Sequence, residues 1–212
     1  MFVVGLTGGI ASGKSFVVRY LKKLKIPSHD SDEAIDRLYK KPSNFFLKYL
    51  KKNNFGKAIN KGKINKSLIK QDIFSDEDKR KKIEFFLHQY VAHQRKKFIK
   101  KNNKEKIIFL DIPLLFEKKL QKECDFICST AASLKTREKR ALQRRGMSKK
   151  LFSLIVKTQV KNKERRLNSN FIINTEGTRK KTYLQVDNMI YCVLNKKNER
   201  GSIRYRNNRP KF

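Results

Sequence analysis

Residues 8–15 are Gly8-Gly9-Ile10-Ala11-Ser12-Gly13-Lys14-Ser15, which match the pattern GxxxxGK[ST] at every fixed position. A short apolar run, residues 2–7, precedes this stretch and is typical of a strand, while residues 14–23 have the apolar spacing of a helix. A glycine-rich turn in this setting points backbone N–H groups at phosphate oxygens, and the helix N-terminus adds its dipole. The stretch therefore predicts a phosphate-binding loop, or P-loop, and an ATP-dependent kinase.

Within this loop, Lys14 is expected to reach the β- and γ-phosphates, and the Ser15 hydroxyl is expected to ligate Mg²⁺. A chance match in a glycine-containing turn is the alternative, which the flanking strand and helix patterns argue against. The residues expected to bind ATP are Gly8, Gly9, Ala11, Ser12, Gly13, Lys14, Ser15 and Phe16.

Carboxylates follow two further strand-like segments. Asp30 and Asp32 come after a short second strand, and Asp111 ends the continuous apolar run 107–110. Ligands of parallel sheets bind at the carboxyl ends of the strands, so these groups and the P-loop should share one edge. One of the first two carboxylates could accept a proton from a substrate hydroxyl, and Asp111 could hold the metal. Helix capping by the first two, and a turn before Pro113 for Asp111, are the alternatives.

Strands alternate with helices at both ends of the chain, which predicts an α/β fold with a parallel sheet covered by helices. We expect one P-loop kinase domain over residues 1–195, with a core of 1–32 and 105–195. No strand is evident between about residues 33 and 104, so we expect a helical insertion there. A final helix should follow a last strand at 171–174, and the basic tail 196–212 lacks apolar periodicity, so we expect it to be mobile.

Arginines gather on a predicted helix within residues 134–144. Arg137, Arg140 and Arg144 share one face by their spacing, which suits a lid, about residues 134–167, that closes on the transferred phosphate. We expect Arg140 above all to stabilise the phosphate. A solvated basic face is the alternative, because basic residues are common throughout this chain.

The net charge of +34 comes from 53 Lys and Arg against 19 Asp and Glu. A nucleic-acid-binding P-loop NTPase is one interpretation of this charge. The basic residues are spread along the chain and accompanied by many Asn and Ile, which favours a compositional bias of an A+T-rich genome. No motif for binding nucleic acid is present, and either way a positive field attracts polyphosphates.

The three cysteines, Cys124, Cys128 and Cys192, lack the spacing of a disulfide framework or zinc site, which favours free thiols and a cytoplasmic protein. The first residues have no basic segment typical of a signal peptide, and the apolar runs are too short to span a membrane. Oligomeric state is left open by the sequence.

Taken together, these motifs resemble the dephospho-coenzyme A kinase family over about residues 1–194. The resemblance rests on the segments 6–15, 30–32, 87–88, 111–117, 137–145 and 171–174, and on Gln159. Gln89 stands where the family usually has proline, and Asn174 where an acid is common. The resemblance implies ATP-dependent phosphorylation of the ribose 3′-hydroxyl of dephospho-coenzyme A. A different nucleoside or nucleotide kinase on the same core is the alternative.

Site roles also follow from the resemblance. Asp32 matches the base, and Lys14 and Arg140 match the groups that stabilise the transferred phosphate. The residues that fall where the acceptor should bind are Asp32, His88, Leu115 and Glu117. The implied cofactors and partners are ATP, Mg²⁺ and dephospho-coenzyme A.

Overall fold

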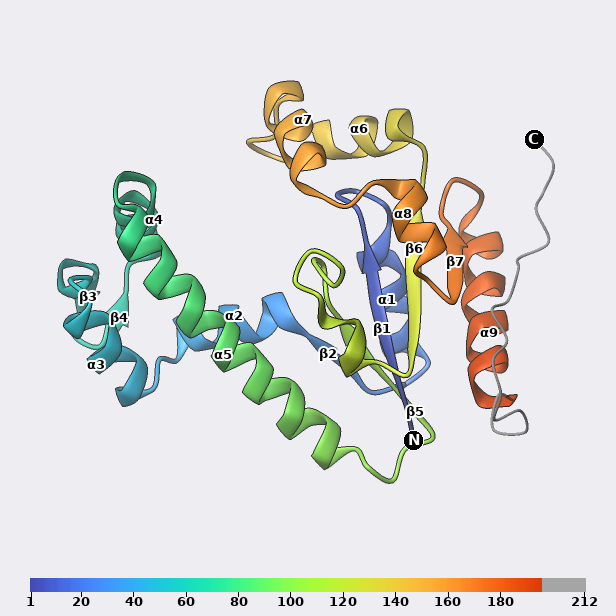
Figure 1. The fold of residues 1–212 in the computed structure, drawn as a ribbon, viewed down its shortest axis with the longest axis horizontal. Coiled ribbons are helices and arrows are strands. Elements are labelled where there is room, and N and C mark those ends of the chain that lie inside the picture. The colour runs from blue at the N-terminus through green and yellow to red at the C-terminus, as the bar shows by residue number, and fades with distance from the viewer. Residues whose placement is uncertain (196–212) are drawn as a thin grey trace. The chain divides into compact units, whose positions relative to one another are not determined.

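A computed structural model describes residues 1–195, so the expected mobile tail 196–212 lies outside the described residues. The chain divides into two compact units. The sheet unit holds Met1–His29 and residues 102–195, and the insert unit holds Asp30–Lys101. The elements (Figure 1) are β1 (Phe2–Gly8), α1 (Lys14–Lys23), β2 (Ser28–Asp30), α2 (Ser31–Lys40), α3 (Asn44–Lys52), η1 (Gly56–Ala58), β3 (Ile59–Asn60), β4 (Lys63–Ile64), α4 (Lys66–Ser75), α5 (Glu77–Lys101), β5 (Ile107–Asp111), η2 (Leu120–Glu123), β6 (Phe126–Ala131), α6 (Leu134–Leu142), α7 (Lys149–Thr158), α8 (Asn162–Leu167), β7 (Phe171–Asn174) and α9 (Arg179–Asn195).

The sheet unit is built on a five-stranded sheet in the order β2-β5-β1-β6-β7, which confirms the predicted α/β fold. β1 pairs in parallel with both β5 and β6, and β6 pairs in parallel with β7. In these ladders Leu6 lies opposite Asp111, and Gly8 lies opposite Thr130. The parallel register therefore brings the end of β1, where the P-loop begins, to the ends of β5 and β6.

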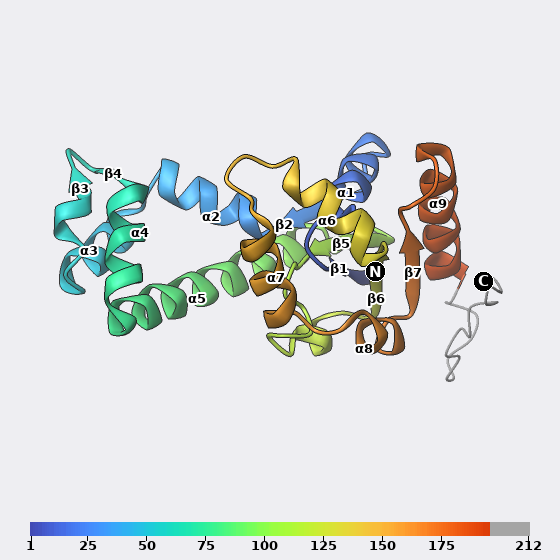
Figure 2. The ribbon, with the colours of Figure 1, turned by 90° about the horizontal axis from the view of Figure 1, so that it is seen from above.

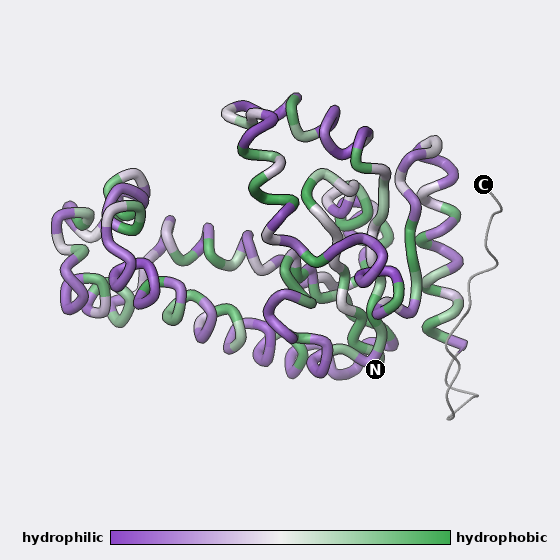
Figure 3. The backbone as a smooth tube through the Cα atoms, turned by 45° about the horizontal axis from the view of Figure 1, so that its top comes forward, coloured by the Kyte–Doolittle hydropathy of each residue, from purple (hydrophilic) through white to green (hydrophobic). Residues whose placement is uncertain are grey.

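Helices cover the sheet on both faces, and Figure 2 shows α1 and α8 on opposite sides of β6. α9 packs beside α1 and β7 and alternates apolar with polar residues along its length (Figure 3). Its apolar face joins residues of the strands and α1 in one core, whose fully buried members include Val4, Leu6, Val17, Leu21, Ile173, Val186 and Met189. No helix in residues 1–195 has the length and apolar character needed to cross a bilayer.

The insert unit has its own apolar core, formed by Phe46, Leu50, Phe55, Ile69 and Ile83 among others. Besides its helices it contains the β3–β4 hairpin, in a segment where no strand is evident from the sequence. The two strands have two residues each and are joined by Lys61 and Gly62, both with positive φ (45° and 75°). Such a two-residue turn suits a tight hairpin, but strands this short leave no alternating pattern in the sequence.

The segment expected to form the lid, about residues 134–167, is divided into three helices. α6 ends at Leu142, earlier than the predicted helix, so Arg144 and Arg145 lie beyond it, before Gly146 with a φ of 78°. α7 and α8 are separated at Gln159, whose backbone is extended. Next to it, the N–H of Val160 donates to Glu117 instead of to a helical carbonyl. A side chain from another part of the chain thus replaces a helical hydrogen bond, which the local sequence could not indicate.

The core of the insert unit can be tested on two adjacent phenylalanines of α3. Phe46 is 0% exposed and packs against the rings of Tyr39 and Phe86, whereas Phe45 is 72% exposed. We expect Phe46→Ala to lower the free energy of unfolding by about 3–5 kcal/mol, because it leaves a cavity. Phe45→Ala should lower it by less than about 1 kcal/mol. Urea denaturation of both variants measures the difference, and equal losses would contradict this description of the core.

Candidate active site

The P-loop connects β1 to α1 and has the geometry of an anion site. Gly13 precedes α1 with a φ of 90°, a conformation that favours glycine, and no side chain caps this helix end. The first turn of α1 carries no acidic residue, and Ser15 at its start is exposed. Unpaired N–H groups and the positive end of the helix dipole therefore lie at the loop, as phosphate binding requires.

Lys14 forms an ion pair with Asp111 at the end of β5. The carboxylate belongs to a residue that is 4% exposed, and the Lys14 side chain is 15% exposed, so the pair is largely shielded from water. The two groups meet because β1 and β5 are adjacent parallel strands.

Hydroxyl groups from neighbouring segments form hydrogen bonds with Ser12 of the loop. The Ser12 hydroxyl lies 2.7 Å from the Thr130 hydroxyl at the end of β6, and Thr130 also donates to the carbonyl of Thr7 at 3.4 Å. Thr175, just after β7, donates its hydroxyl to the Ser12 carbonyl at 2.8 Å. The ends of three strands thus converge on the loop, and Ser12 is 2% exposed as a result.

Arg140 on α6 reaches the same place through Thr175. Its Nη1 donates to the Thr175 hydroxyl at 2.9 Å and its Nη2 to the Thr175 carbonyl at 2.6 Å. Glu176 ties this segment further to the start of α6, because its carboxylate accepts from the N–H of Ser133 and the hydroxyl of Thr136. These hydrogen bonds, from Ser133 first, lower the pKa of Glu176. The Arg140 guanidinium therefore reaches the P-loop through one intervening residue, Thr175, which donates to the Ser12 carbonyl.

Arg137 differs from Arg140 although both lie on α6. It is 3% exposed, and its Nε donates to the Ile10 carbonyl at 2.8 Å. Burial, followed by the charge of Arg165, lowers the pKa of Arg137, although a guanidinium stays protonated at neutral pH. The arginine row predicted to face a phosphate is thus divided: Arg137 binds the loop backbone, Arg140 binds Thr175, and Arg144 lies outside the helix and is exposed.

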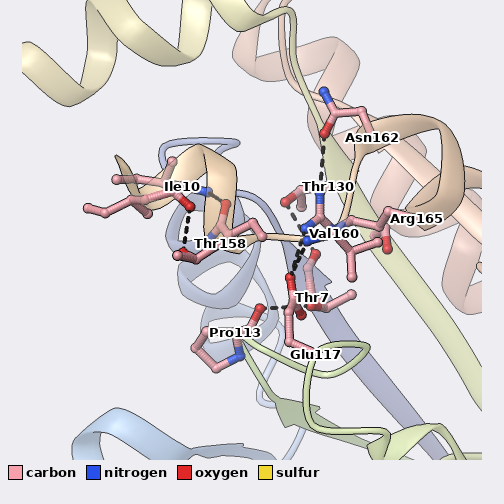
Figure 4. Close-up of polar contacts among 12 residues, drawn as sticks. Thr7, Ile10, Pro113, Glu117, Thr130, Thr158, Val160, Asn162 and Arg165 are labelled. Carbon is pink, nitrogen blue, oxygen red and sulfur yellow. Dashed lines mark hydrogen bonds and ion pairs between the residues drawn. The ribbon is translucent and has the colours of Figure 1, made fainter. Parts of the chain in front are cut away.

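Glu117, in the segment after β5, forms a buried ion pair with Arg165 of α8. Its Oε1 accepts from Arg165 Nη2 at 3.3 Å and from the N–H of Val160 at 2.9 Å. Figure 4 shows Glu117 pointing toward Val160 and Arg165, with Asn162 bonded to the same guanidinium. The two side chains are 13% and 3% exposed, so this contact joins two segments inside the sheet unit.

Residues 2–181 match the model of the family described as dephospho-CoA kinase. The chain belongs to the dephospho-CoA kinase family. It is 35% identical over 197 residues to the dephospho-CoA kinase of Bartonella quintana, covering 92% of this chain and 99% of that relative. It is 32% identical to that of Novosphingobium aromaticivorans, covering 94% and 98%.

Solved structures agree with this family fold. The crystal structure of TT1252 from Thermus thermophilus superposes with a TM-score of 0.75 and 25% identity, covering 91% of this chain and 97% of that one. Dephospho-CoA kinase from Campylobacter jejuni superposes with a TM-score of 0.67 at 19% identity, over 92% and 98% of the two chains. At 19% identity, the likeness to the Campylobacter jejuni structure supports the fold alone. Membership of this kinase family makes ATP the phosphate donor.

Some residues expected to bind ligands are placed differently by the structure. Leu115 is 0% exposed and its side chain packs beside Gly5, so its role in binding a substrate stays a prediction. Phe16 turns its ring onto Tyr183 of α9, 5.1 Å between ring centroids, and its N–H donates to Gly13. Ala11, with a φ of 56°, packs its methyl group against Ala141 and Phe152.

Asp30 caps α2, with its Oδ1 accepting the Glu33 N–H at 3.0 Å, as the capping alternative predicts. Asp32 follows in the first turn of α2 and is exposed, and His88 is exposed on α5. Sequence reasoning missed Thr175 and Glu176 altogether. The local sequence shows a polar turn after the last strand. Such a turn indicates a loop, but it does not indicate which residues that loop contacts.

The role of Glu117 can be decided by substitution. We expect Glu117→Ala to destabilise the protein by about 3–5 kcal/mol, because it leaves the Arg165 guanidinium buried without its counter-ion. The matched control is Glu77→Ala on α5, whose pairs with Arg80 and Lys81 are exposed and worth less than about 1 kcal/mol. Thermal unfolding compares the two. A stable Glu117→Ala variant with a raised KM for the acceptor would show that Glu117 binds substrate instead.

Proposed function

We propose that this chain transfers the γ-phosphate of ATP to the 3′-hydroxyl of the ribose of dephospho-CoA, which yields CoA and ADP. Membership of the dephospho-CoA kinase family over residues 2–181 supports the substrate. The observation that carries the chemistry is a complete P-loop whose lysine is paired with a strand-end carboxylate, Lys14 with Asp111. The roles of the individual residues below are part of the proposal.

Phosphate binding uses backbone donors and three side chains. The N–H groups at the start of α1 receive the phosphate oxygens, and Lys14 exchanges Asp111 for the β- and γ-phosphates. Gly8, Gly9 and Gly13 allow the backbone to approach closely, and Ser12 is held below it by Thr130. Arg140, positioned by Thr175, adds positive charge on the γ-phosphate side. We propose that residues 134–167, which carry Arg140, act as the lid.

Ser15 and Asp111 present the oxygen donors that suit Mg²⁺, a hydroxyl at the start of α1 and a carboxylate at the end of β5. The fit is chemical: both are hard oxygen ligands, and a magnesium site of this kind takes its remaining ligands from phosphates and water. When bound, Mg²⁺ neutralises charge on the β- and γ-phosphates.

In the transfer step, the ribose 3′-oxygen forms a bond to the γ-phosphorus, and the bond from that phosphorus to the β,γ-bridging oxygen breaks. ADP leaves with the electron pair, and the hydroxyl proton passes to the carboxylate of Asp32. Asp32 is favoured over Asp30 because it matches the position of the base in the family resemblance, whereas Asp30 caps α2. We place His88, on the same insert unit as Asp32, on the acceptor side.

We propose a cytoplasmic location, because the chain belongs to a kinase family and the spacing of its three cysteines is not that of a disulfide framework. Proteins with structural disulfides belong to oxidising compartments. Burial raises the pKa of the Cys128 thiol, which keeps it unreactive. We propose no nucleic-acid partner, because the positive charge is dispersed along the chain.

The function is tested by coupling ADP release to a panel of acceptors: dephospho-CoA, adenosine, AMP and shikimate, with RNA as a separate addition. We expect dephospho-CoA to give the highest kcat/KM and RNA to leave ATP hydrolysis unchanged. Lys14→Ala should abolish transfer with the fold retained, as circular dichroism would show, because the ammonium neutralises the transferring phosphate. A preference for another acceptor, or normal turnover by the folded Lys14→Ala variant, would refute the proposal.

The base is tested by two amide substitutions on one short segment. Asp32→Asn should lower kcat by about 10²–10⁴-fold with nearly unchanged ATP affinity, since a positioned base contributes about that much. Asp30→Asn is the control, because asparagine caps a helix about as well as aspartate and should leave kcat close to the parent value. The reverse result would make Asp30 the base. A rise only in the KM for the acceptor would make Asp32 an orienting group.

A further inference from the structure

Both hydrogen-bonding groups of one P-loop residue, Ile10, are bound by side chains from elsewhere in the sheet unit. The Ile10 N–H donates to Gln159 Oε1 at 2.9 Å, and the Ile10 carbonyl accepts from Arg137 Nε at 2.8 Å. Arg137 Nη2 lies 3.5 Å from the same Gln159 oxygen, so the two side chains also contact each other. We call this arrangement, formed by Arg137 and Gln159 on Ile10, the Ile10 clamp.

The clamp decides which way the loop backbone points. Because the Ile10 N–H is directed at Gln159, it is not among the donors available to phosphate, and the turn that follows must supply them. That turn is tight: the Ser12 N–H donates to the Gly9 carbonyl at 3.1 Å, and Ala11 has a φ of 56°. Fixing the two peptide groups beside Ile10 therefore fixes the direction of the N–H groups that come next.

The fit between Arg137 and the loop is close. A Cβ atom added to Gly9 would lie 2.5 Å from Arg137 Nη2, so the guanidinium lies directly against the glycine backbone. Apolar contacts reinforce the clamp, since Ile10 and Ala11 pack with Ala141 of α6 and Phe152 of α7. Arg137 is 3% exposed, so its side chain is enclosed by the loop and its neighbours.

The clamp is itself held by a chain of hydrogen bonds that ends at the segment after β5. Asn162 Oδ1 accepts from Arg137 Nη1 at 3.2 Å and from Arg165 Nη1 at 3.1 Å, and Arg165 pairs with Glu117. Two like-charged guanidinium groups thus share one amide oxygen. Glu117 is the counter-ion of Arg165, and Figure 4 shows that contact. Buried charges of one sign are tolerated only with such partners, so the orientation of Arg137 is strongly determined.

We propose that Arg137 and Gln159 are positioning residues for phosphoryl transfer, which set the phosphate-binding backbone in its ligand-ready form before ATP binds. This deepens the proposed function and rests on it for the transfer step. Preorganised donors bind without reordering the loop, and a misplacement on the order of 1 Å costs about 10²-fold in rate. The proposal therefore predicts an effect on ATP binding and on turnover, with the KM for the acceptor left nearly unchanged.

The test compares Gln159→Met, which keeps the length of the side chain and removes the acceptor oxygen, with Thr158→Ala. Thr158 is the preceding residue, and its hydroxyl bonds only locally, to the Ile155 carbonyl. We expect Gln159→Met to raise the Kd for ATP by about 5- to 10-fold, because it removes one hydrogen bond and leaves the Ile10 N–H without its acceptor. The Kd is measured by calorimetry without acceptor. The KM for dephospho-CoA should stay within about twofold, and Thr158→Ala should match the parent.

Two further variants separate positioning from mere stabilisation. Gln159→Glu keeps an acceptor oxygen for Ile10 beside Arg137 and should stay within about threefold of the parent in ATP affinity. Arg137→Met and the double variant with Gln159→Met complete a cycle, in which the two changes should be clearly non-additive because both act on one residue. If Arg137→Met does not fold, the Gln159 variants alone decide the matter.

The proposal is overturned if Gln159→Met loses thermal stability but binds ATP as Thr158→Ala does, since the contact would then be structural only. It is also overturned if the KM for dephospho-CoA rises instead of the Kd for ATP. Because ATP binding is measured without acceptor, a chain that binds ATP but does not phosphorylate dephospho-CoA would refute the proposed function and leave the clamp standing.

Discussion

The parallel pairing of β1 between β5 and β6 is the constraint on which the site depends. Leu6 lies opposite Asp111, and Gly8 lies opposite Thr130, so the chain leaves β1 with a carboxylate on one side and a hydroxyl on the other. Lys14 can meet Asp111, and Ser12 can meet Thr130, only in this register. A shift of one residue would turn each side chain to the opposite face of its strand and remove both contacts.

Two basic side chains beside the P-loop, those of Arg137 and Arg140, form hydrogen bonds that hold the loop backbone. Arg137 and Arg140 lie one turn apart on α6, yet one is bonded to Ile10 and the other to Thr175. Both partners belong to the loop or contact it, since Thr175 donates to Ser12. The loop is therefore enclosed by segments that are separated from it by more than 120 residues, which gives a glycine-rich turn a single conformation despite its intrinsic freedom.

A buried charged network such as Glu117, Arg165 and Arg137 is not an efficient source of stability. Desolvation offsets most of the attraction between such groups, and an apolar replacement can be equally stable. The network provides orientation, because guanidinium groups have a fixed donor geometry. Asn162 orients Arg137, and Glu117 orients Arg165, which donates to the same Asn162 oxygen. Exposed pairs elsewhere, such as Arg37 with Glu33 on α2, carry no such constraint and reflect the abundance of basic residues.

The sequence by itself determined the fold class, the P-loop with Lys14, and Asp111 at the end of a buried strand, because each depends on a contiguous pattern. Helical spacing likewise placed Arg137 and Arg140 on one helix, but spacing says nothing about what faces that helix. Only the tertiary structure decided that Arg137 binds Ile10, that Leu115 is buried, and that Glu117 pairs with Arg165. The β3–β4 hairpin and the break at Gln159 were decided there as well. In all of these cases but the hairpin, the energy comes from a partner distant in sequence, which no local pattern contains. The hairpin has strands of two residues each, which are too short to leave an alternating pattern.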